Sequence, residues 1–163
     1  MEKTLSKALL TVYIIMLIWL VLFKLQFDIS HIVNRHHRSV NLTPFLYAVK
    51  REILLNWLFF IPFGVLLNVV YKRTGFIAKF LIILAFSLTA EVIQYIFAIG
   101  VTDITDLISN SLGGLAGLIL YMLFNTFIED RKLDRFVVTV GIILFLIFIF
   151  IHGSHYFRRT LFR

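Results

Sequence analysis

The stretch FIAKFLIILAFSLTAEVIQYIFAI, from Phe76 to Ile99, is too long and too apolar to lie on the surface of a soluble protein. A helix rises about 1.5 Å per residue, so roughly twenty such residues cross a hydrocarbon core of about 30 Å. Four further stretches share this character: Ala8–Phe23, Ile53–Tyr71, Leu107–Ile128 and Phe136–His152. Because lipid offers no partner to a free backbone amide, each stretch is expected to be helical. The sequence predicts an all-α, polytopic membrane protein with five short transmembrane helices.

The overall composition supports this fold class. Hydrophobic residues make up 60% of the 163 residues, and the mean hydropathy is +0.94. The length accommodates short helices and tight loops, so residues 1–163 are expected to form a single transmembrane domain. The longest polar connection, Lys24–Glu52, is too short for a core of its own. The N-terminal segment lacks the small-residue cleavage site of a signal peptide, which predicts a retained first helix.

The composition also excludes several function classes. The chain contains no cysteine, which excludes disulfides, thiol nucleophiles and thiolate metal sites. We expect no bound metal or cofactor. A net charge of +7 would suggest nucleic acid in a soluble protein, but here the sixteen Lys and Arg residues cluster at helix ends. Such residues anchor helices against anionic headgroups, so membrane lipids are the expected partner and nucleic acid is not.

The distribution of positive charge bears on the membrane orientation. Summed over alternate connections, Lys and Arg are equally numerous on the two sides. The second and fourth connections are short and dense in positive charge, whereas the charged residues of the third are all acidic. We therefore predict a cytoplasmic N-terminus and an extracellular C-terminus in the cell membrane. In either orientation the first connection, Lys24–Glu52, and the third, Gly100–Asp106, lie on the same face.

Nearly all the unusual polar residues fall on that shared face. Ser87, Glu91 and Gln94 lie on one stripe of the third helix. A carboxylate at this depth typically faces a bundle interior or a wet cavity. Asp103 and Asp106 are expected in the loop that follows, with Asp103 favoured as the cap of the fourth helix. The predicted ligand-binding residues are Asn41, Pro44, Asn56, Glu91, Gln94, Asp103, Asp106 and Asn110.

A glycine seam is expected to pack the fourth helix against a neighbour. Gly113 and Gly117 lie four residues apart, with Gly114 beside them, and small residues at this spacing let helices approach closely in lipid. Asp106 and Asn110 lie on the same stripe, so this packing would aim them at the polar residues of the third helix. The seam could equally join two copies of the chain, which leaves a homo-oligomer open.

The second predicted helix has a proline in its interior. Pro62 removes one helical hydrogen bond and is expected to bend the helix below Asn56, and Gly64 eases close packing. The polar residues also have a purely structural interpretation, in which Asn56 and Gln94 join helices at about 0.6–2 kcal/mol per hydrogen bond. Glu91 is the exception, since packing alone seldom requires a carboxylate in the membrane.

Several short motifs follow one another in a fixed order. They are Asn41-Leu42-Thr43-Pro44-Phe45, Asn56, Phe60-Ile61-Pro62-Phe63-Gly64, Glu91-Val92-Ile93-Gln94, Asp103-Ile104-Thr105-Asp106, and Asn110 with Gly113, Gly114 and Gly117. This ordered set, over about residues 41–120, resembles the VanZ-like family. The resemblance implies a small membrane protein of Gram-positive bacteria that lowers susceptibility to teicoplanin and related lipoglycopeptides. It does not imply the altered peptidoglycan terminus that accompanies vancomycin resistance.

Three mechanisms are compatible with these residues. In the first, an extracellular polar face binds or shields teicoplanin or a lipid-linked peptidoglycan precursor, and its carboxylates pair with ammonium or amide groups. In the second, an intramembrane enzyme modifies a lipid or lipid-linked precursor through Glu91 with Asp103 or Asp106, as an acid–base pair or around a divalent cation. The cluster has no Lys or Arg to hold phosphate. The third, a transporter, usually requires more helices. We favour the binding mechanism.

Overall fold

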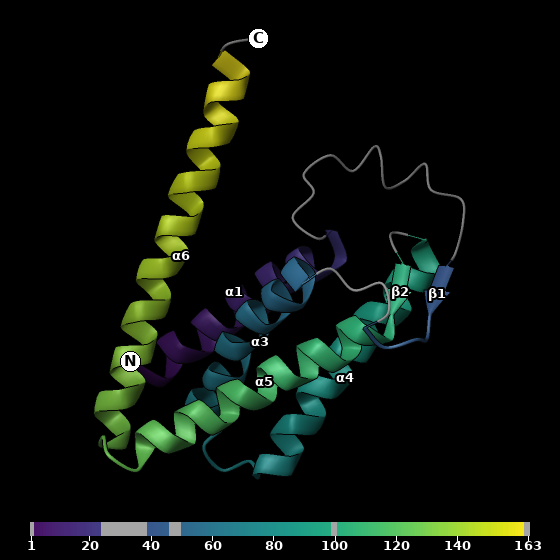
Figure 1. Cartoon of the computed structure of the whole chain (residues 1–163). Helices are drawn as coiled ribbons and strands as arrows, with labels where there is room; N and C mark the ends of the chain where they lie inside the picture. Colours follow the sequence, from purple (N-terminus) through teal and green to yellow (C-terminus); the bar gives the residue numbers. More distant parts are fainter. Residues whose placement is uncertain (1, 24–38, 46–49, 99–100, 162–163) are drawn as a thin grey trace.

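The computed structural model describes residues 2–23, 39–45, 50–98 and 101–161. Across these residues the chain forms long helices and two short strands (Figure 1). They are α1 (Glu2–Phe23), β1 (Ser39–Asn41), α3 (Lys50–Val70), α4 (Phe76–Phe97), β2 (Val101–Asp103), α5 (Ile104–Asn125) and α6 (Asp130–Leu161). Five helices each contain a span of 21 or 22 residues that is apolar enough to cross a membrane. The protein is therefore an all-α, multi-pass membrane protein.

The predicted spans coincide with the helices, but the helix ends differ. α5 begins at Ile104, whereas the predicted start was Leu107. Asp106 was predicted to lie in the preceding loop, but it lies in the first turn of the helix. The reason is that Asp103 caps the helix, because its carboxylate accepts a hydrogen bond from the backbone N–H of Thr105. α6 begins at Asp130, six residues before the predicted start, because its charged first turn is helical as well.

The two strands were not predicted. β1 and β2 pair in parallel, with Ser39 opposite Val101 and Asn41 opposite Asp103. The pair joins the end of the first connection to the junction between α4 and α5 (Figure 1). Each strand has three residues, too few for an alternating pattern to be recognised in the sequence. The pairing places the first and third connections at the same end of the bundle, as five membrane crossings require.

α3 and α5 pack backbone to backbone at the centre of the bundle. A Cβ atom on Gly64 would overlap the carbonyl oxygen of Gly114, and one on Gly117 would overlap the carbonyl oxygen of Ile61. The glycine seam of α5 therefore packs against α3 within the chain. Gly113 faces the same helix, since an added Cβ would lie 2.9 Å from Cα of Trp57. Close contact of this kind supplies van der Waals energy that lipid-facing side chains do not.

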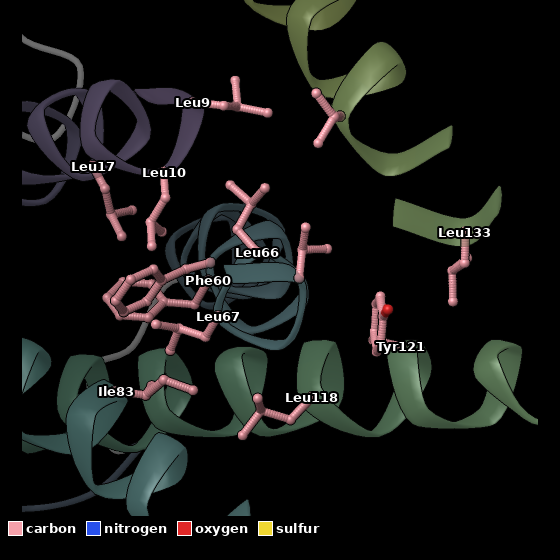
Figure 2. Packing of buried hydrophobic residues seen from close by; sticks show 13 residues of the cluster. Leu9, Leu10, Leu17, Phe60, Leu66, Leu67, Ile83, Leu118, Tyr121 and Leu133 are labelled. Atoms are coloured by element: carbon pink, nitrogen blue, oxygen red, sulfur yellow. The ribbon is translucent and has the colours of Figure 1, made fainter. Parts of the chain in front are cut away.

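Large apolar side chains fill the remaining interior between the helices (Figure 2). Phe60 and Phe63 of α3 are almost fully buried, and their rings lie 6.0 and 5.2 Å from the ring of Phe86 on α4. Leu17 of α1, Ile83 of α4 and Leu118 of α5 complete this core from the other helices. α6 contributes least, since only 11% of its span is buried within the chain. Figure 1 shows α6 leading away from the other helices.

Candidate functional site

The predicted polar residues gather at the end of the bundle that carries the strand pair. The start of α3, the end of α4 and the start of α5 meet there beside β1 and β2 (Figure 1). Hydrogen bonds made by their side chains link these elements across the sequence. We call this group of residues, Asn41, Asn56, Glu91, Asp103, Thr105, Asp106 and Ser109, the polar cluster.

Glu91 ties α4 to β2. Its side chain is buried, at 4% exposure, and Oε2 accepts a hydrogen bond of 3.0 Å from the backbone N–H of Asp103. The backbone carbonyl of Glu91 also accepts from the hydroxyl of Thr102, at 3.2 Å. A charged acceptor shortens and strengthens a hydrogen bond to a backbone N–H. Glu91 therefore fixes the position of the segment that carries Asp103.

Asp103 joins three parts of the chain. One carboxylate oxygen accepts from the N–H of Thr105 at 2.8 Å and so caps α5. The other accepts from the side-chain amide of Asn41 at 3.1 Å, across the strand pair. The amide oxygen of Asn41 in turn accepts from the backbone N–H of Thr43, which shapes the turn that follows β1. The carboxylate of Asp103 is half-buried, so this junction is accessible from outside the bundle.

The turn that follows β1 places Pro44 and Phe45 on the surface. Both residues are exposed. Phe45 has φ = 61°, in the left-handed region that bulky residues rarely adopt. Its backbone N–H donates to Oγ1 of the buried Thr105, at 3.1 Å, and this bond holds the turn against the start of α5. Strained backbone of this kind is concentrated at functional sites.

Asn56 connects α3 to α5. Its side-chain nitrogen donates to Oδ1 of Asp106 at 2.9 Å and to Oγ of Ser109 at 3.0 Å. The hydroxyl of Ser109 donates to the backbone carbonyl of Asp106. Asp106 and Ser109 are buried, whereas Asn56 is half-buried. Asp106 was predicted to face α4, but its carboxylate accepts the hydrogen bond from Asn56 on α3.

Asn110 and Gln94 lie deeper and are almost fully enclosed. The side-chain nitrogen of Asn110 donates to the hydroxyl of Ser87 on α4, at 3.0 Å. That of Gln94 donates to the carbonyl of Val21 on α1, at 3.0 Å. Within the described ranges, Oδ1 of Asn110 and Oε1 of Gln94 are buried and accept no hydrogen bond. A buried amide oxygen without a hydrogen bond lowers the stability of the fold by about 1–3 kcal/mol. Both oxygens can therefore accept a hydrogen bond from a donor that reaches them.

The candidate residues thus divide into a rim and a floor. Asn41, Asn56 and Asp103 are half-buried and Pro44 is exposed, so they form the rim. The second group, which we call the floor, is buried and consists of Glu91, Gln94, Asp106 and Asn110. Among the described residues, no group of three acidic, histidine or cysteine side chains lies close enough together to hold a metal ion. The arrangement suits recognition of a ligand by hydrogen bonds and charge at the rim.

A second polar group at the opposite end of the bundle was missed from the sequence. Lys72 pairs with Asp134 at 2.9 Å, and the hydroxyl of Tyr121 donates to the same carboxylate at 2.6 Å. Nearby, the buried ammonium group of Lys79 donates to Oδ1 of Asn68 at 2.7 Å. Lys79 lies one turn inside α4, and this position in an apolar stretch was the available signal.

Comparison with known proteins assigns the family. A family model described as VanZ/LLP1 matches residues 10–125. The chain is also similar to Protein VanZ from Enterococcus faecium, with 52% identity over 156 residues, which covers 95% of this chain and 96% of that protein. No solved structure matches the chain. The polar cluster lies within the matched region, and the chain belongs to the VanZ/LLP1 family.

Proposed function

We propose that this protein lowers susceptibility to teicoplanin and related lipoglycopeptides by binding the drug, or a lipid-linked cell-wall precursor, at the polar cluster. Membership of the VanZ/LLP1 family supports the resistance function. The observation that carries the binding mechanism is the convergence of α3, α4, α5 and the strand pair on one hydrogen-bonded group of amides and carboxylates.

The chemistry of the rim suits such ligands. The side-chain nitrogen of Asn41 has a second hydrogen to donate, the amide oxygen of Asn56 offers an acceptor, and Asp103 offers a charge to an ammonium group. Sugar hydroxyls and peptide groups of a ligand can pair with these atoms. Glu91 holds the backbone of Asp103 from below, so the rim is ordered before a ligand arrives. A site fixed in advance loses less conformational entropy on binding. Teicoplanin-type drugs carry an acyl chain that places them in the membrane, next to this end of the bundle.

This mechanism requires the polar cluster to face the outside of the cell. The N-terminus is then cytoplasmic and the C-terminus extracellular, the orientation that the charge distribution predicts. A reporter fused after Arg163 and active on one side of the membrane tests this orientation. Activity on the cytoplasmic side would exclude an extracellular polar cluster.

Binding to the purified full-length chain in nanodiscs tests the mechanism. We expect micromolar binding of teicoplanin or of precursor lipid, and weaker binding after Asp103→Asn, which removes the rim charge. Asp130→Asn is the matched control, because Asp130 is an exposed acid at the opposite end of the bundle. No binding of either ligand at micromolar concentration would refute the proposal, as would equal loss in the two variants.

An intramembrane enzyme remains the alternative, because Glu91, Asp103 and Asp106 bring three carboxylates to one end of the bundle. The two mechanisms differ in what happens to cellular lipids. A binding protein leaves the mass profile of membrane lipids and lipid-linked precursors unchanged on expression. A new species that depends on Glu91 would establish chemistry and replace the binding mechanism.

A further inference from the structure

A cavity of about 580 Å³ opens at the end of the bundle opposite the polar cluster. It lies between the first turns of α1, the connection that follows α3, and the first turns of α6. Its lining extends along α6 from Arg131 to Ile142, which corresponds to about 16 Å of helix. The cavity therefore reaches from the membrane surface into the hydrocarbon layer.

The lining of this cavity is strongly basic. Six of the side chains carry positive charge, and they are Lys3, Lys7, Lys72, Arg73, Arg131 and Arg135. The one acidic side chain in the lining, Asp134, is engaged by Lys72 at 2.9 Å and by the hydroxyl of Tyr121. Within the described part of the chain, Lys3, Lys7, Arg73 and Arg131 form no ion pair. Four of the six cations, which come from α1, the connection after α3 and α6, therefore have no acid paired with them in the part of the chain that the structure describes.

Part of the remaining lining is apolar. Val69 and Val70 from the end of α3 and Val138 and Ile142 from α6 form this part of the wall. Val69 and Val138 are buried, at 6% and 7% exposure. Charged residues that only contact water do not require an apolar wall beside them. A small inorganic anion could bind the cations but would leave the apolar wall without a contact. The combination of cations and an apolar wall fits a ligand that has an anionic head and a hydrocarbon tail.

We propose that this cavity binds the phosphate headgroup of an anionic phospholipid, with one acyl chain along Val138 and Ile142. Basic pockets between transmembrane helices are suited to such headgroups, and each Lys or Arg near a membrane surface adds attraction to anionic lipid. Arg is particularly well matched to phosphate, since its planar group donates two parallel hydrogen bonds. The site is separate from the polar cluster, and its function does not depend on the identity of the drug or precursor bound there.

Native mass spectrometry of the purified full-length chain tests this site. The detergent-solubilised protein is titrated with phosphatidylglycerol and with phosphatidylcholine of identical acyl chains. We expect preferential retention of phosphatidylglycerol, and about a fivefold loss of that affinity in Arg131→Gln and in Arg73→Gln, each of which removes one cation. Lys132→Gln is the matched control. Lys132 is adjacent to Arg131 and exposed, but it pairs with Glu129 and lies outside the cavity.

The outcomes separate the sources of the phosphate. Displacement of inorganic phosphate by phosphatidylglycerol, but not the reverse at millimolar phosphate, supports a lipid site. Removal of the bound lipid by millimolar inorganic phosphate would overturn the proposal in favour of a soluble anion. Equal retention of the two lipids, or equal losses in Lys132→Gln and Arg131→Gln, would also overturn it, because either result would indicate nonspecific surface charge.

Discussion

The side-chain amide of Asn56 donates a 2.9 Å hydrogen bond to Asp106, although fifty residues separate the two in the chain. The bond joins the first turns of α3 to the first turn of α5, just above the point where the two helices come into backbone contact. It therefore sets the rotation of α5 relative to α3, and with it the direction in which Asp106 points. The geometry of the polar cluster depends on this pair.

Replacement of Asn56 by Ala should lower stability. The substitution removes the hydrogen bonds to Asp106 and Ser109, and bonds between transmembrane helices contribute about 0.6–2 kcal/mol each. We expect the free energy of unfolding in detergent to fall by about 1–2 kcal/mol. Asn125→Ala is the control, because Asn125 is exposed at the end of α5 and should change stability by no more than about 0.5 kcal/mol. Equal effects in the two variants would contradict the assigned role.

Substitutions in the glycine seam should differ in severity according to what an added Cβ meets. Gly64→Ala and Gly117→Ala place the methyl group against backbone carbonyls, which cannot move without separating α3 from α5. We expect losses at or above the upper end of about 1–3 kcal/mol, with little folded protein recovered. Gly114→Ala meets the side chain of Ile83, which can rotate, so its loss should be smaller.

Gly75→Ala serves as the control for this series. An added Cβ there has no neighbour within 4 Å, so the variant should match the parent protein in size-exclusion profile and unfolding temperature. A stable Gly117→Ala protein would show that α3 and α5 are farther apart than described.

Glu91→Gln separates the charge of this side chain from its shape. The amide oxygen of glutamine still accepts a hydrogen bond from the N–H of Asp103, so the fold should survive. If the negative charge is needed for ligand binding, teicoplanin susceptibility of a host expressing the variant should return to that of the empty vector. Susceptibility is measured at matched membrane abundance, with Glu129→Gln, an exposed acid at the other end, as the control. Undiminished resistance would make Glu91 a structural residue.

The buried pair of Lys79 and Asn68 should behave as a unit. Asn68→Leu removes the amide oxygen that accepts from the Lys79 ammonium group and also the donor to the carbonyl of Leu118. We expect a destabilisation of about 3–5 kcal/mol, because a buried charge loses its partner. Addition of Lys79→Met should recover most of that loss, since an apolar replacement of similar volume needs no partner. Chemical unfolding of the three proteins in one detergent measures both effects.

The membrane spans could be predicted from the sequence because apolar runs of this length have no other stable form in lipid. The cap at Asp103 was also predicted, and the structure confirms it. The first turn of α5 was nevertheless assigned to a loop, because Asp106 is a polar residue at the end of an apolar stretch and is equally compatible with a loop and with a helical turn. The prediction that the polar residues share one end of the bundle followed from counting crossings. Their specific partners did not follow from it.

Asp106 illustrates why the hydrogen-bond partners of the polar residues could not be predicted from the sequence. Its position on the stripe of α5 was correctly aligned with Asn110, and both were expected to face α4. Gly113 and Gly117 instead face α3, and Asp106 meets Asn56 of that helix while Asn110 meets Ser87 of α4. Helical periodicity indicates which residues share a face of one helix. Which neighbouring helix packs against that face depends on side-chain volumes across several elements. The Lys72–Asp134 pair was missed for the same reason, since each residue alone resembles an ordinary interfacial charge.

The strand pair also constrains how the chain is made. Asn41 can meet Asp103 only after sixty-two further residues have been synthesised, and these include all of α3 and α4. Until then β1 lacks its partner strand. Completion of the polar cluster is therefore a late event in biogenesis, since a nascent chain that ends before residue 101 lacks β2 and α5.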